Sequence, residues 1–100
     1  MAQQFFRDSG FENIALVATV TGAATAIAAP GAGNSIYLLG VNAHANTILR
    51  ENDGNGNIIL AVGAGNSNLP ATIKVSSNTA VYNTAANNTS IIYYIDSTNY

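Results

Sequence analysis

The side chains that could carry out acid–base chemistry are few and scattered along the sequence. The single histidine is His44, and the acidic residues are Asp8, Glu12, Glu51, Asp53 and Asp96. A general base needs a nucleophile and an orienting group beside it, and a glycosidase needs two carboxyl groups held in different environments. The spacing supplies neither arrangement, and cysteine is absent. We therefore predict that the protein is not an enzyme and has no catalytic residue.

Two motifs rich in loop-forming residues are the next candidates for binding. Asp53-Gly54-Asn55-Gly56-Asn57 begins like a calcium loop, but Ile58 and Ala64 stand where that loop needs Gly and Glu. The pentapeptide Gly-Ala-Gly-Asn-Ser occurs at 31–35 and at 63–67, without the Lys-Ser/Thr of a phosphate-binding loop. We interpret the first motif as a hairpin turn and both pentapeptides as loops between strands. The sequence predicts no metal site and no cofactor.

Composition excludes several classes of partner. Of the 100 residues 48% are hydrophobic and only 8% are charged, against about 25% charged in an ordinary soluble domain. The net charge is −2, and Arg7, Arg50 and Lys74 are the only cations, so no basic patch for nucleic acid is expected. No apolar run approaches the roughly 20 residues that span a bilayer, and the N-terminus lacks a secretory-signal pattern. One small domain with neither a nucleic-acid nor a membrane partner is predicted.

The elements that would position any site are short strands. Runs of Ile, Val, Thr and Tyr are separated by Gly, Asn, Asp and Pro, and no helical periodicity extends over three turns. The predicted strands cover residues 13–21, 24–29, 35–43, 46–51, 57–62, 71–76, 79–83 and 90–96. Regular short strands without crossover helices predict an all-β fold, an antiparallel β-sandwich spanning residues 13–100. Eight strands in this length fit a small jelly roll.

Alternation along the strands assigns their two faces. In the first strand Ile14, Leu16, Ala18 and Val20 share one face, and in the last Ile91, Tyr93 and Ile95 face the core. The segments 36–39 and 58–62 are instead apolar on both faces. Because a sandwich strand needs only one apolar face, these two segments predict a second covering layer. A loop, the N-terminal arm or a neighbouring subunit could supply it.

Residues 1–12 form a predicted N-terminal arm. It contains every phenylalanine of the chain, Phe5, Phe6 and Phe11, close to Arg7. Aromatic residues gathered in a terminus can dock on a partner protein. They can also fold back and close the end of the sandwich, and the sequence leaves both alternatives open.

From about residue 15 to residue 95 the sequence resembles the small capsid decoration, or cement, proteins of tailed bacteriophages. The resemblance is carried by the Ala/Thr-rich first strand and by the segments 36–40, Leu69-Pro70, 78–83 and 91–95. It implies a jelly roll or related sandwich, commonly a homotrimer, on the outer capsid surface of the virion. Such a protein is made in the host cytoplasm and clamps adjacent copies of the major capsid protein.

This resemblance leads to two groups of expected contact residues. We expect Phe5, Phe6, Arg7 and Phe11 to meet the capsid shell, and Tyr37, Leu39, Ile92 and Tyr94 to contact other subunits. The alternative is a carbohydrate-binding β-sandwich of a phage fibre or surface lectin, which would stack sugar rings on Tyr37, Tyr82, Tyr94 and Tyr100. The chain has no tryptophan for such stacking.

Overall fold

A computed structural model describes residues 15–99 of the chain, and these residues form eight β-strands and no helix. The strands are β1 (Leu16–Val20), β2 (Ala24–Ile27), β3 (Asn34–Ala43), β4 (Thr47–Glu51), β5 (Ile58–Val62), β6 (Gly65–Lys74), β7 (Val81–Asn83) and β8 (Thr89–Ser97). The predicted arm, residues 1–12, lies outside the described part of the chain. Residues 13–14, the start of the predicted first strand, lie outside it as well.

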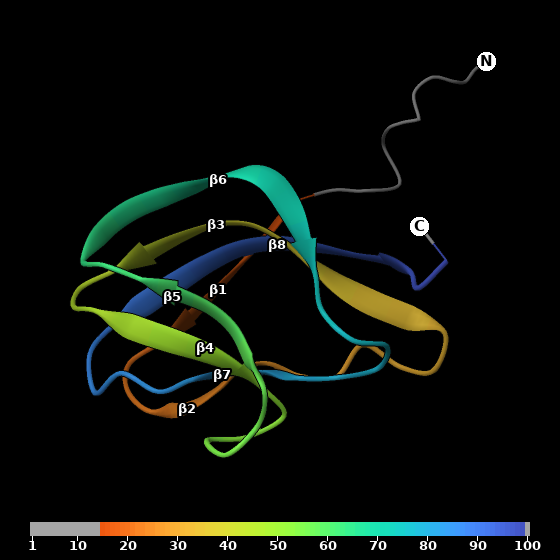
Figure 1. Cartoon of the computed structure of the whole chain (residues 1–100), viewed down its shortest axis with the longest axis horizontal. Coiled ribbons are helices and arrows are strands. Elements are labelled where there is room, and N and C mark those ends of the chain that lie inside the picture. The colour runs from red at the N-terminus through yellow and green to blue at the C-terminus, as the bar shows by residue number, and fades with distance from the viewer. Residues whose placement is uncertain (1–14, 100) are drawn as a thin grey trace.

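The strands form two four-stranded sheets, and every pairing is antiparallel (Figure 1). The first sheet has the order β1-β8-β3-β6 and the second the order β2-β7-β4-β5. The pairing is nested, because β1 pairs with β8, β2 with β7, β3 with β6 and β4 with β5. The predicted all-β antiparallel sandwich is confirmed.

The sixth strand differs most from its predicted range. It begins at Gly65 rather than at residue 71, so it takes in the last three residues of the second Gly-Ala-Gly-Asn-Ser motif, which was predicted to be a loop. Gly65 enters the strand with a φ of 107°, which favours glycine, and Gly65, Asn66 and Ser67 then pair with Ala43, Asn42 and Val41. Pairing with a neighbouring strand therefore recruits polar residues of low strand propensity.

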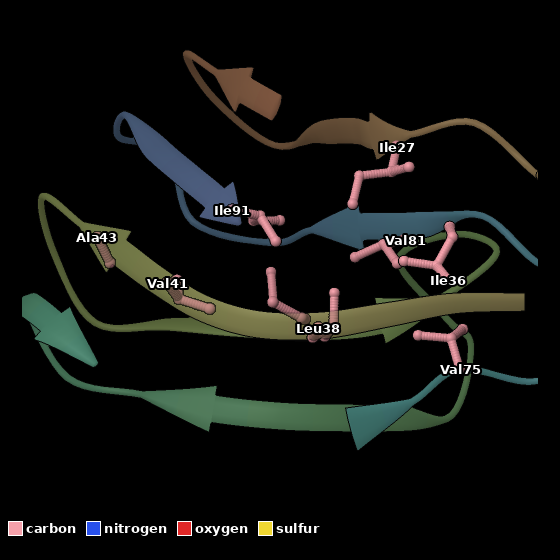
Figure 2. Packing of buried hydrophobic residues seen from close by; sticks show 9 residues of the cluster. Ile27, Ile36, Leu38, Val41, Ala43, Val75, Val81 and Ile91 are labelled. Carbon is pink, nitrogen blue, oxygen red and sulfur yellow. The ribbon is translucent and has the colours of Figure 1, made fainter. Parts of the chain in front are cut away.

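The core lies between the two sheets, and β3 supplies much of it (Figure 2). A register shift between Leu38 and Gly40 adds a residue to β3, so Leu38 and Val41, three positions apart, both face inward. In Figure 2 the side chains of Leu38, Ile91 and Val81 come together from β3, β8 and β7. The buried core residues are Ile27, Ile36, Leu38, Val41, Ala43, Leu49, Val75, Val81 and Ile91.

The predicted faces of β1 and β8 need a correction at one end of the sandwich. Ile91 is buried and Tyr93 and Ala18 pack against the core, as predicted. Ile95, which was also predicted to face the core, is 36% exposed, and Leu16, which shares a face of β1 with Ala18, is 42% exposed. Alternation gives the correct side of the sheet, but burial also requires an opposing layer, and the second sheet does not cover these two side chains.

The hairpin between β4 and β5 forms where the turn motif predicted it, with different backbone chemistry. The residue with positive φ is Asn52, at 74°, and not the glycine of the Asp-Gly or Asn-Gly pair. Gly56 is required for another reason: a Cβ on it would lie 1.6 Å from the Glu51 carbonyl oxygen. The turn is held by hydrogen bonds from Gly56 N to Asp53 O and from Asn55 N to Asp53 Oδ1.

Candidate interaction surfaces

The acidic side chains of the described residues accept hydrogen bonds from backbone N–H groups. Glu51 accepts a hydrogen bond from Ser76 N at 3.0 Å, Asp53 from Asn55 N at 2.9 Å, and Asp96 from Ser97 N at 2.7 Å. Between residues 15 and 99 no group of three His, Cys, Asp or Glu side chains gathers where a metal could bind. Their geometry fits a structural role.

His44 lies at one end of the first sheet, beside a polar hollow of about 360 Å³. Its backbone N–H donates to Asn88 O at 2.9 Å, which fixes the loop before β8 against the end of β3. The hollow is lined by Asn42, Ala43, His44, Gly65, Asn88 and Ser90. These groups offer hydrogen bonds but no charged partner for the imidazole.

The outer face of the first sheet carries a row of residues that we call the apolar row: Val17, Ile92 and Gly40. Val17 pairs with Ile92, and Ile92 pairs with Gly40 on β3. Val17 is 66% exposed and Ile92 is 40% exposed. A Cβ on Gly40 would approach Ser67 O at 3.3 Å, so the backbones of β3 and β6 lie close together here. Two neighbouring aliphatic side chains are therefore presented to solvent beside a position without a side chain.

An aromatic pair lies next to the apolar row. Tyr37 and Tyr94 are paired across β3 and β8, and their rings stack with centroids 5.0 Å apart and planes 7° apart. The Tyr37 hydroxyl donates to Ser97 O at 2.5 Å, and Lys74, which pairs with Tyr37 from β6, donates to Thr98 O. Tyr37 is only 5% exposed. Tyr37, which was expected to contact another subunit, is therefore almost entirely covered by its own chain.

A polar row borders the other side of the apolar row. Thr19, Ser90, Asn42 and Asn66 follow one another across all four strands of the first sheet. Thr19 and Ser90 share a hydrogen bond of 3.2 Å between their hydroxyl groups. Along the strands this face therefore changes from aromatic to apolar to polar. A partner with a matching order of side chains could bind it in one orientation.

The predicted contact residues have different positions in the structure. Ile92 is exposed, Tyr94 and Leu39 are half-buried, and Tyr37 is buried. Phe5, Phe6, Arg7 and Phe11 lie outside the described residues. Sequence reasoning overlooked Val17 as a contact residue, although its place opposite Ala18 in the alternation of the first strand already marked it as outward-facing.

The second sheet has a separate feature, a hollow of about 530 Å³ where β4 begins and β5 ends, which we call the β4–β5 hollow. Thr84 fixes one wall, because its N–H and its hydroxyl both donate to Ile48 O, at 3.2 and 2.8 Å. The lining residues are Asn46, Thr47, Ile48, Ala61, Val62, Gly63, Thr84 and Ala85. Most of them are apolar or small, so the hollow is suited to an aliphatic group.

No protein-family model matches the chain, and no curated protein or solved structure is significantly similar to it. The part of the chain that the structure describes contains no helix able to cross a membrane. The function of the protein is therefore inferred from the exposed surfaces of its two sheets.

Proposed function

We propose that this protein is a structural component of a virus particle, a decoration or cement protein that binds the outer capsid shell and reinforces contacts between major capsid proteins. The observation that carries the proposal is the exposed pair Val17 and Ile92, which lies on the outer face of a β-sheet. Single exposed aliphatic side chains are common, but these two are neighbours and have a polar row at their border, and protein interfaces combine an apolar centre with a polar rim.

The chain topology supports the jelly-roll interpretation that accompanies this proposal. The nested pairing of β1 with β8, β2 with β7, β3 with β6 and β4 with β5 is what a long folded-over hairpin produces when it wraps into two sheets. A sandwich of this kind holds its outer face rigid, so little conformational entropy is lost when the face is covered.

Cementing requires attachment without chemistry, and the described residues suit it. Each exposed apolar pair contributes a weak contact, because two aliphatic side chains bury little surface. Several copies around a symmetry axis convert weak contacts into firm attachment, since each later contact forms at a high effective concentration. The low charge of the chain, 8% of its residues, leaves little repulsion to oppose close packing on a shell.

Capsid shells of the encoding virus, assembled without this protein, provide the test. We expect purified protein to decorate them, with density over the outer surface in electron micrographs. The double variant Val17→Thr/Ile92→Thr should lower occupancy by about tenfold, because it keeps strand propensity but removes apolar surface. Ala86→Thr, at an exposed loop position, is the matched control.

Two results would overturn the proposal: undecorated shells with the unaltered protein, or full occupancy with the double variant. The arm is examined in the same assay with Phe5→Ala/Phe6→Ala. Reduced occupancy of this variant, with an unchanged far-UV spectrum, would support the prediction that Phe5 and Phe6 meet the shell. Full occupancy would show that Phe5 and Phe6 are not needed for binding to the shell.

The carbohydrate-binding alternative has less geometric support. Tyr82 belongs to the second sheet, where it pairs with Arg50 and Thr25 and lies against the turn at Gly54. Tyr37 and Tyr94 belong to the first sheet and stack on each other. The tyrosines of the described residues therefore do not form one platform for a sugar, and Tyr100 lies outside those residues.

A further inference from the structure

We propose that β5 is a self-association edge, at which two copies of the chain pair antiparallel about a two-fold axis through Ala61 and join their second sheets into one. The proposal is independent of the capsid function argued above, because it concerns the opposite sheet. It rests on three observations: an open edge strand, the direction of its backbone groups, and a projecting side chain that matches a hollow at the other end of the same strand.

Among residues 15–99, β5 is an edge strand of the second sheet, and β4 is its one paired neighbour. Its five residues, Ile58–Val62, contain no charge and no proline, and the register shift in its pairing with β4 is confined to its start, at Ile59. Natural sheets usually blunt such edges with charges, proline or bulges. The edge strand β6 of the first sheet is interrupted by residues 69–72, which lie between its two paired segments and include Pro70. β2 has only four residues and a register shift at Thr25.

The backbone of Ala61 points away from its own sheet. Thr84 N donates to Ile48 O, and Ile48 N donates to Thr84 Oγ1, so both backbone groups of Ile48 face β7. Ala61 is opposite Ile48 across the β4–β5 pair. In an antiparallel ladder, hydrogen-bonded and non-hydrogen-bonded pairs alternate, so the N–H and C=O of Ala61 face the open side. They are available to a second strand.

Pairing two copies of β5 at Ala61 uses these groups symmetrically. The N–H and C=O of one Ala61 bond to the C=O and N–H of Ala61 in the second copy, as residues do in a hydrogen-bonded antiparallel pair. The same register places Leu60 opposite Val62 of the second copy. Opposed residues lie on the same face, so the inward side of one sheet continues as the inward side of the other. The small side chain of Ala61 leaves room at the axis.

The projecting side chain and the hollow favour a second copy of this chain as the occupant. Ile58 is 58% exposed, and it pairs with Arg50, which shares a face of β4 with Ile48 in the wall of the β4–β5 hollow. Ile58 therefore shares a face with Ile48, and it lies at the opposite end of β5 from the hollow. The two-fold axis brings Ile58 to the far end of β5 in the second copy, next to Gly63 in the lining of its hollow.

This arrangement is reciprocal, as a two-fold interface must be: each copy offers Ile58 and receives Ile58. The edge is also held in place before it binds. Arg50 Nη1 donates to Gly56 O at 2.8 Å before β5, and Ala64 N donates to Asn46 Oδ1 at 3.1 Å after it. A strand fixed at both ends loses less conformational entropy on pairing.

Sedimentation velocity over a concentration series tests the proposal with the full chain. We expect a monomer–dimer equilibrium, and Ile58→Lys should raise its Kd by at least about tenfold, because a charge would be forced against the hollow. Val17→Lys, which places the same charge on the first sheet, should leave the Kd unchanged while it weakens shell binding. This pair of variants separates failure of the edge from failure of the proposed function.

Two substitutions at Ala61 test the register. The chain has no cysteine, so Ala61→Cys should form a disulfide-linked dimer on mild oxidation, since hydrogen-bonded antiparallel pairs have Cα atoms about 5.5 Å apart. Ala86→Cys is the control. Ala61→Pro should abolish dimers but keep the far-UV spectrum, because it removes only an outward-facing N–H.

A monomer at the highest soluble concentration would overturn the proposal. So would a trimer, which the resemblance to cement proteins implies, if Ala61→Cys did not cross-link it. A dimer unaffected by Ile58→Lys would equally exclude this interface. If Ala61→Pro fails to fold, the Ile58→Lys and Ala61→Cys results decide the outcome.

Discussion

Strands β3 and β5 share one sequence property but lie in different environments in the structure. Both contain a run that is apolar on both faces, 36–39 in β3 and 58–62 in β5. β3 lies between β8 and β6, and Ile36, Tyr37 and Leu38 are all buried within one chain. β5 lies at the end of its sheet, and Ile58 at its start is more than half exposed.

The difference comes from the number of neighbouring strands. β3 has a strand on each side, and Tyr94 from β8 stacks on the outward-facing Tyr37. β5 has only β4, so one side of the strand and part of its outer face meet solvent. A second covering layer was predicted for both runs, and within residues 15–99 neighbouring strands cover the run of β3 but leave Ile58 of β5 exposed. The remaining apolar surface of β5 is what a partner would cover.

The largest expected effect is at the centre of β3. Leu38→Ala removes a fully buried side chain of the core and should lower the free energy of unfolding by roughly 2–5 kcal/mol, measured by urea denaturation. Leu60→Ala in β5 is the matched control. Leu60 is only partly buried, so its loss should be clearly smaller. Equal losses at the two positions would contradict the comparison.

An intermediate effect is expected at the turn that leads into β5. Gly56→Ala would place a Cβ 1.6 Å from Glu51 O, so the backbone of the hairpin must shift. We expect a loss of about 1–3 kcal/mol in thermal or chemical denaturation, comparable to other sites of backbone strain. Gly54→Ala is the control: its Cβ would meet only the Tyr82 ring, at 3.6 Å, and should change stability little. Similar losses for both variants would show that the close approach at Gly56 is not the cause.

The smallest effect is expected on the exposed side of β5. Ile58→Thr should change the free energy of unfolding of dilute protein by no more than about 0.5 kcal/mol, because an exposed side chain makes few contacts. The same variant should weaken self-association at high concentration. A loss of stability as large as that of Leu38→Ala would mean that Ile58 is part of the core and that β5 is not an open edge.

Much of the fold could be predicted because it depends on local pattern. The alternation and turn residues predicted eight strands, and most of their observed ends differ by only a few residues from the predicted ranges. The start of β6 could not be predicted, since Gly65, Asn66 and Ser67 adopt strand geometry through pairing with β3. The exposure of Leu16 and Ile95 likewise depended on where the second sheet ends.

The candidate surfaces were predictable only in part. Alternation correctly placed Ile92 and Tyr94 on the face opposite the core, but it could not show that Tyr37, on the same face, is buried by its neighbours. Ile58 and the β4–β5 hollow were not predicted as a surface at all. No local signal distinguishes an edge strand from a central one when both are apolar on both faces.

The sequence by itself determined the fold class, the side-chain alternation of each strand and the position of the β4–β5 turn, because these follow from the geometry and propensities of neighbouring residues. Only the tertiary structure decided which apolar strand became central and which remained an edge. That outcome depends on which strands pair over long separations in the chain, and burial is a property of the assembled layers and not of any single strand.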